Sequence, residues 1–240
     1  MATFVLVHGA WHGSWCWKRV RKTLQSQGHD VFTPTLTGVG ERSHLLSPLV
    51  TLDTHIDDIV NLIRWEELSN VVLCGHSYGG CVISGVANRV SDRIGSLIYL
   101  DAFVLQDGQS LHDTLPPPQR DLQIALARDH GDGWRVPPIP AEVFNVNARD
   151  RDWVNRQCTM QSLATFQQPV TLTGAADASP ATFILATGWS DSPFPPFRDR
   201  AKARGWTTLS IPCGHDVMLD RPEELTTALL AVADAQRSAR

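Results

Sequence analysis

Residues 71–80, VVLCGHSYGG, limit the fold of this chain more than any other stretch. The apolar, β-branched start is typical of a buried strand, and the small residues from Gly79 onward are typical of a closely packed helix. Between them Ser77 stands in the pattern G-x-S-x-G, where glycines allow the backbone to bend within a few residues. A serine pushed outward at such a strand-to-helix turn is a nucleophile elbow. We therefore predict Ser77 as a nucleophile, the alternative being a small serine in a structural turn.

Short apolar runs alternate with helical patterns along most of the 240 residues. Strands are expected at residues 4–9, 30–38, 71–76, 94–103, 182–187 and 206–212. These runs are apolar on both faces and are separated by helical segments, which is typical of parallel strands. The sequence therefore predicts an α/β fold with a mostly parallel sheet flanked by helices on both sides.

The alternation stops between residues 107 and 180. This segment holds proline clusters at residues 116–118 and 137–140 and several scattered aromatic residues. It is too long for a plain loop and too irregular for another sheet unit. We expect an inserted cap, or lid subdomain, at residues 107–180, and a core formed by residues 1–106 and 181–240.

Composition excludes several classes of partner. The formal net charge is −4 and the lysines and arginines are scattered, so we expect no nucleic-acid or membrane partner.

The five cysteines form no CxxC pair, which is typical of reduced thiols in a cytoplasmic protein. No basic segment precedes the first apolar run, and no run reaches the ~18 apolar residues of a membrane span. A homodimer is compatible with this composition, and no metal-ligand spacing occurs, so we expect no metal and no cofactor.

A serine nucleophile needs a base and an acid. His215 follows the last expected strand, so it should share the C-terminal edge of the sheet with Ser77. In the order serine, acid, histidine, the acid follows the strand at residues 182–187, which favours Asp191. Asp101, at the end of the strand before the cap, is the alternative. Asp216 is adjacent to His215 and is expected to be solvated or salt-bridged.

Two backbone N–H groups should stabilise an oxyanion. Tyr78 follows the nucleophile, and Ala10 lies on the loop after the first strand, so we assign the two donors to these residues. The alternative for Ala10 is an ordinary strand-to-helix loop. Candidates for the substrate pocket, which could equally be packing residues, are Gly9, Trp11, Phe103, Trp134 and Trp153.

The motifs HGAWHGSWCW (residues 8–17), GHSYGG and GHDVML resemble the α/β-hydrolase superfamily over essentially the whole chain. They look like the branch of plant methyl-ester esterases, hydroxynitrile lyases and bacterial esterase-like relatives. The resemblance implies an α/β-hydrolase fold and a Ser–Asp–His triad, with the family's acid position on Asp191. Similar lyases carry Thr in place of Gly9 and Lys after the catalytic His, where this chain has Asp216. Since an aspartate would oppose departing cyanide, the sequence favours ester hydrolysis. Plant esterases usually carry an apolar residue there.

Three functions follow as hypotheses. The first is a serine carboxylesterase that hydrolyses a moderately hydrophobic, aromatic or bulky small-molecule ester through an acyl-enzyme. The second is a hydroxynitrile-lyase-like or other cofactor-free enzyme that cleaves C–C or C–O bonds. The third is a non-catalytic small-molecule receptor, which would have no need of a nucleophile and a base.

Overall fold

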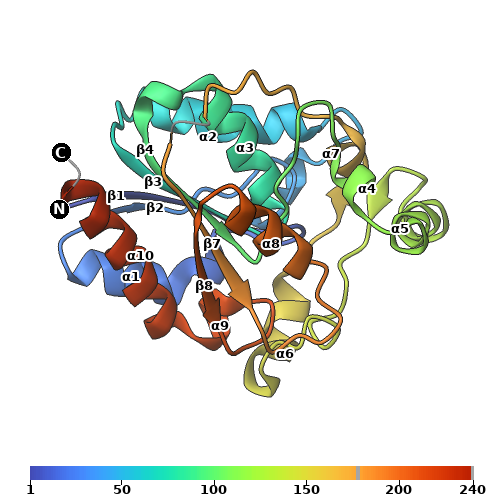
Figure 1. The fold of residues 1–240 in the computed structure, drawn as a ribbon. Coiled ribbons are helices and arrows are strands. Elements are labelled where there is room, and N and C mark those ends of the chain that lie inside the picture. The colour runs from blue at the N-terminus through green and yellow to red at the C-terminus, as the bar shows by residue number, and fades with distance from the viewer. Residues whose placement is uncertain (177–178, 239–240) are drawn as a thin grey trace.

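The computed structural model describes residues 1–176 and 179–238. Its centre is a six-stranded sheet in the order β2-β1-β3-β4-β7-β8, with parallel pairing between all neighbours (Figure 1). The strands are β1 (Thr3–Val7), β2 (Asp30–Phe32), β3 (Val71–His76), β4 (Ile94–Leu100), β7 (Ala181–Ala186) and β8 (Thr207–Ile211). Every residue of β3 is buried, as expected for a strand with helices on both faces. The α/β prediction is confirmed.

Helices cover both faces of this sheet (Figure 1). α1 (Lys18–Ser26) and α10 (Pro222–Ser238) pack together on one face, and α2 (Leu52–Trp65) and α3 (Gly79–Arg89) pack together on the other. Shorter helical segments are η1 (Ser14–Trp17), η2 (Gly40–Leu45), η3 (Ser91–Arg93), α8 (Pro195–Ala203), which packs on β7 and β8, and α9 (Val217–Asp220). Among residues 1–176 and 179–238, no helix is both long and apolar enough to cross a membrane.

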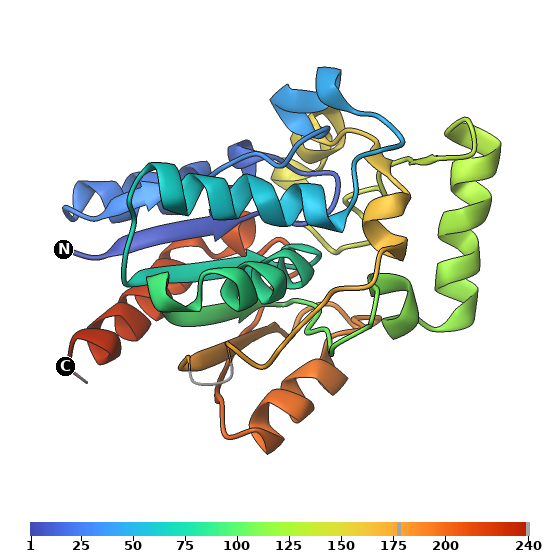
Figure 2. The same cartoon turned by 90° about the horizontal axis from the view of Figure 1, so that it is seen from above.

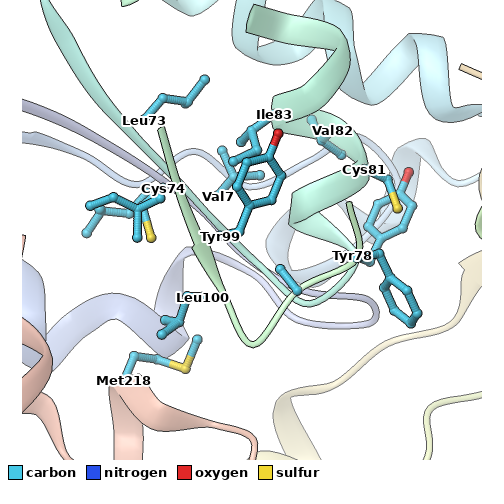
Figure 3. Packing of buried hydrophobic residues seen from close by; sticks show 14 of the residues in the cluster. Val7, Leu73, Cys74, Tyr78, Cys81, Val82, Ile83, Tyr99, Leu100 and Met218 are labelled. Carbon is cyan, nitrogen blue, oxygen red and sulfur yellow. The ribbon is translucent and has the colours of Figure 1, made fainter. Parts of the chain in front are cut away.

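The core lies between the sheet and these helices. Side chains alternate along β4, so that Tyr99 faces α3 while Leu100 faces Met218 of α9 (Figure 3). Val82 and Ile83 of α3 lie on the same side as Tyr99, and all five side chains are buried. This packing fixes the start of α3, and with it the turn that precedes α3, against the middle of the sheet.

Residues 107–180 add elements that do not join the main sheet. They contain α4 (Leu111–Thr114), α5 (Pro117–His130), β5 (Arg135–Val136), α6 (Ala148–Gln157), β6 (Gln161–Ser162) and α7 (Ala164–Gln167). β5 and β6 pair as a small antiparallel sheet. Figures 1 and 2 show α4 and α5 beyond one end of the main sheet. The proline cluster at residues 116–118 begins α5, since proline suits the first turn of a helix. The division into core and cap domains stays a prediction.

Candidate active site

Ser77 lies in a strained turn between β3 and α3. Its φ of +54° is in the left-handed region, which non-glycine residues seldom adopt and which costs roughly 1–3 kcal/mol. Backbone hydrogen bonds hold this conformation: the Ser77 N–H donates to the Leu100 carbonyl (3.2 Å), and the Ser77 carbonyl accepts from the N–H groups of Gly80 (3.0 Å) and Phe103 (3.2 Å). The serine that the sequence selects is therefore fixed in the conformation of a nucleophile elbow.

The glycines around Ser77 are required by close backbone approach. A Cβ atom on Gly75 would lie 2.4 Å from the carbonyl oxygen of Gly79. One on Gly79 would lie 2.8 Å from the carbonyl oxygen of His8, and one on Gly80 would lie 2.2 Å from that of Phe103. Because all three obstacles are backbone atoms, no side-chain movement could relieve them. The turn therefore requires glycine at these three positions, because any side chain would clash with the backbone.

His215 lies on the loop after β8 and is buried, with 3% of its surface exposed. Its Nδ1–H donates to Oδ2 of Asp101 at 2.6 Å, and the Ala186 N–H donates to Oδ1 of the same carboxylate at 3.1 Å. Asp101 directly follows β4, the strand next to β3, and is itself fully buried with a φ of +42°. This contact leaves Nε2 as the ring nitrogen of His215 that can accept a proton.

The structure corrects the choice of Asp191 as the partner of His215. The loop after β7 starts with a hydrogen bond from the Gly188 N–H to the Cys213 carbonyl (2.7 Å), and it then carries Trp189 and Phe194 against the imidazole. Asp191 lies between these two aromatic residues in the sequence, and its side chain is exposed. Asp101, the alternative, occupies the position beside His215. The order serine, acid, histidine along the chain is kept, but the acid comes one strand earlier than expected.

Burial sets the charge state of the pair. It lowers the pKa of His215 to about 4, while the Asp216 carboxylate raises this pKa and the His12 ring lowers it. His215 is therefore neutral at pH 7, as a general base must be. Burial raises the pKa of Asp101, and the N–H of Ala186 partly offsets this effect. Since that N–H stabilises the carboxylate, we assign the shared proton to Nδ1 of His215.

A cavity of about 90 Å³ joins these groups. Ser77, His215, Ala10 and Tyr78 all line it. Aromatic rings form half of the remaining lining, from Trp11, Phe103, Phe144, Phe166, Trp189 and Phe194. Gln119 and Gln123 of α5 add amide groups to the lining. Within the described residues, no group of three or more His, Cys, Asp or Glu side chains could hold a metal ion.

Two of the five pocket candidates, Trp11 and Phe103, line this cavity. Gly9 is not among the lining residues, but its backbone lies against the nucleophile turn, since a Cβ on Gly9 would be 3.0 Å from Cβ of Ser77. Trp134 and Trp153 are corrections to the sequence prediction, because neither lines the cavity. Trp134 lies in the segment after α5 with the Arg135 guanidinium over its ring, and Trp153 of α6 packs edge-on against Trp15 at 5.0 Å. Trp153 packs against the hydrophobic core, and Trp134 is half-buried beside Arg135.

The two expected oxyanion donors, Ala10 and Tyr78, both lie at the cavity that contains Ser77. Ala10 follows β1, Tyr78 follows Ser77 directly, and both residues line the cavity. The Tyr78 side chain points into the core, where its hydroxyl lies 2.8 Å from Nδ1 of His55. This buried contact holds Tyr78 at the start of α3, with its backbone beside Ser77.

Sequence reasoning missed two features around His215. The rings of Phe144, Trp189 and Phe194 lie 5.1–5.3 Å from the imidazole, and nothing in the periodicity of the sequence marks them. Asp216 is fully buried, and its Oδ2 lies 3.1 Å from Nε2 of His12, which is 204 positions away along the chain. The expected salt bridge of Asp216 is therefore present, but in the interior rather than at the surface.

Comparison with known proteins assigns most of the chain to one family. The model of the alpha/beta hydrolase family matches residues 4–228. A carbendazim hydrolyzing esterase from Nocardioides sp. (strain SG-4G) is 50% identical over 242 residues, covering 97% of this chain and 100% of that protein. Methyl jasmonate esterase 1 from Vitis vinifera is 32% identical over 136 residues, covering 52% of this chain and 51% of that protein.

A solved structure extends the likeness to the whole fold. An extracellular alpha/beta-hydrolase from a Paenibacillus species matches with a TM-score of 0.84 at 23% identity, covering 97% of this chain and 99% of that chain. The relatives support hydrolase or esterase function, and the family model and the shared fold agree with the parallel sheet flanked by helices described above. The chain therefore belongs to the alpha/beta hydrolase family.

Proposed function

We propose that this protein is a serine carboxylesterase that acts without a cofactor. The observation that carries the proposal is the 2.6 Å hydrogen bond from His215 to Asp101, in a cavity whose wall also contains Ser77. A buried acid orients the imidazole, and the imidazole is neutral at pH 7, so Nε2 can take the proton of a serine hydroxyl. In this assignment Asp101 takes the role first expected of Asp191.

The reaction proceeds in two halves. Ser77 Oγ attacks the ester carbonyl as its proton moves to Nε2 of His215, and the tetrahedral intermediate collapses when His215 protonates the leaving alcohol. Water then attacks the acyl-enzyme by the same route, which releases the acid and frees Ser77. Asp101 stabilises the imidazolium that forms in both halves. The N–H groups of Ala10 and Tyr78 bind the oxyanion, where one such donor is typically worth ~10²–10³ in kcat.

The cavity favours a substrate with one small and one flat apolar substituent. Its volume of about 90 Å³ is below the ~300–1,000 Å³ usual for ligand sites, and six tryptophan and phenylalanine side chains line it. The small volume favours a methyl group as one substituent, and the aromatic side chains favour a planar ring that can stack against them. Carbendazim, for which the Nocardioides relative is named, is a methyl carbamate on a benzimidazole ring and has this shape. We propose methyl esters and methyl carbamates of planar aromatic compounds as the substrate class.

The cavity favours ester hydrolysis over cyanohydrin cleavage. Among the described residues, no lysine or arginine lines the cavity, so no fixed side-chain cation is at hand to stabilise departing cyanide. The reason differs from the one drawn from sequence, because Asp216 is paired with His12 and does not line the cavity either.

The experiment that tests this proposal combines turnover with labelling of the nucleophile. Purified protein is assayed with carbendazim, methyl benzoate, 4-nitrophenyl acetate and mandelonitrile, and a fluorophosphonate adduct is mapped by peptide mass spectrometry. We expect ester or carbamate hydrolysis, labelling at Ser77, and a loss of about 10³-fold or more in kcat for Ser77→Ala. Ser84→Ala is the matched control, because Ser84 is a buried serine of α3 that bonds to the Gly80 carbonyl. Labelling elsewhere, or full turnover by Ser77→Ala, would refute the proposal.

A further inference from the structure

The loop that carries Ala10 contains a conformation that needs support from outside the loop. Trp11 has a φ of +64°, a left-handed value that is rare for a bulky side chain, and it is buried. Its indole Nε1–H donates to the Val136 carbonyl (3.1 Å), and its own carbonyl accepts from the Thr159 N–H (3.0 Å). Segments from the 107–180 region therefore hold Trp11 in place.

The peptide group between Ala10 and Trp11 is held at both ends. Its carbonyl, on Ala10, accepts a hydrogen bond from Nδ1 of His12 at 2.7 Å. Its N–H, on Trp11, donates to Oε1 of Gln161 at 2.9 Å. All of these residues are buried. Two bonds on opposite edges of one peptide plane fix its rotation, and this plane is joined at the Cα of Ala10 to the peptide group that contains the Ala10 N–H.

The orientation of Gln161 follows from its second bond. Thr165 Oγ1 donates to the Ser162 carbonyl (2.7 Å), so this hydroxyl is left to accept from Nε2 of Gln161 (2.8 Å). The amide oxygen of Gln161 must then face the N–H of Trp11. The hydrogen bonds that Gln161 makes to Trp11 and Thr165 therefore have one consistent arrangement of donors and acceptors.

The hydrogen bonds on the His12 side of the Ala10–Trp11 peptide require a charged histidine. The Ala10 carbonyl can only accept a hydrogen bond, so Nδ1 of His12 must carry a proton. Nε2 of His12 faces the Asp216 carboxylate at 3.1 Å, which also accepts. A ring that donates from both nitrogens is an imidazolium, and Asp216 is its counter-ion in the interior.

The charges around this pair agree with that assignment. Burial alone would lower the pKa of His12, but Cys158, whose Sγ lies 3.9 Å from Nδ1, and Asp216 together raise it well above its usual value. Burial alone would raise the pKa of Asp216, but His12, His76 and His215 together hold it well below its usual range. Of these rings, His76 has its Nε2 4.0 Å from Oδ1 of Asp216, and this nitrogen donates a hydrogen bond to the His215 carbonyl (3.0 Å).

We propose that His12, Asp216 and Gln161 are positioning residues that clamp the Ala10–Trp11 peptide and thereby hold the Ala10 N–H in place for the oxyanion. The clamp connects three parts of the chain: the loop after β1, the residue next to His215, and β6. Its catalytic consequence rests on the proposed esterase function, whereas its charge state and hydrogen bonds do not.

The kinetic test uses Gln161→Met, which keeps the shape of the side chain but removes the acceptor for the Trp11 N–H. With 4-nitrophenyl acetate, we expect kcat to fall about tenfold or more while KM changes less than about threefold, because the loss is felt in the transition state. Gln168→Met is the matched control. Gln168 is also a glutamine of residues 107–180 whose amide oxygen accepts a core N–H, that of Asp53 (2.8 Å), but it lies outside the clamp. A kcat for Gln161→Met within twofold of the control would overturn the proposal.

The charge test does not depend on turnover. Ring ¹⁵N NMR of the wild-type protein, with His12 assigned by its loss in His12→Gln, should show both nitrogens protonated at pH 7.5. Asp216→Asn leaves the imidazolium without its counter-ion and should unfold at lower denaturant concentration than the double variant His12→Gln/Asp216→Asn, which removes both charges. A neutral His12 ring, or a double variant no more stable than the single one, would overturn the clamp. A wild-type protein that hydrolyses no ester would instead refute the proposed function.

Discussion

Replacing Asp101 by asparagine separates the two candidate acids most directly. Asparagine keeps the size of the side chain, and its amide oxygen can still accept from the Ala186 N–H. Its NH₂ group, however, can take the place of Oδ2, which now accepts from Nδ1–H of His215 at 2.6 Å. An amide donor at that point favours the tautomer with the proton on Nε2, and this tautomer cannot act as a base for Ser77.

The size of the effect follows from the loss of the base. The same change in a serine protease triad lowers kcat by ~10⁴-fold, and at ~1.4 kcal/mol per factor of ten this is about 5 kcal/mol of transition-state stabilisation. We expect Asp101→Asn to lose 10³–10⁴-fold, by that estimate, in steady-state kcat with 4-nitrophenyl acetate, with its near-ultraviolet circular dichroism unchanged. Asp191→Asn is the control, because Asp191 is exposed and should keep full activity. Activity of Asp101→Asn within tenfold of wild type, or a large loss in Asp191→Asn, would refute this account of the site.

Three further predictions concern stability and specificity. Burial strongly lowers the pKa of four histidines, and each costs up to ~1.4 kcal/mol per pH unit as the pH falls below the unfolded value of 6.5 towards the folded one. These residues are His8, His55, His76 and His215. The urea midpoint should therefore fall steeply between pH 7 and pH 5, and a flat profile would contradict the burial of neutral rings. Gly75→Ala places a Cβ 2.4 Å from the Gly79 carbonyl oxygen and should cost more than ~3 kcal/mol in chemical denaturation, whereas Gly133→Ala, with φ +84° and open space, should cost ~1 kcal/mol. Phe194→Ala removes one cavity wall and should raise kcat/KM for 4-nitrophenyl butyrate relative to the acetate; an unchanged ratio would place Phe194 outside the acyl site.

Local chemistry explains what could be predicted from sequence. The turn at Ser77 could be predicted from the residues next to it. A backbone that returns on itself within a few positions leaves room only for glycine at Gly75, Gly79 and Gly80. The parallel sheet could be predicted in the same way, since its four inner strands, β1, β3, β4 and β7, are apolar runs that are largely buried. The position of His215 follows from the rule that strand ends in such a sheet meet at one edge.

Only the tertiary structure decided which side chains meet at that edge. Asp191 and Asp101 both follow strands that end there, and the choice depends on how the loop after β7 folds. That loop turns Trp189 towards the imidazole and leaves Asp191 exposed, while Asp101 directly follows β4, the neighbour of the strand that precedes Ser77. Contacts of this kind join residues far apart along the chain through the shape of the whole fold. Periodicity and spacing, which report only on near neighbours, therefore placed Ser77 and His215 at this edge but did not select the carboxylate that contacts His215.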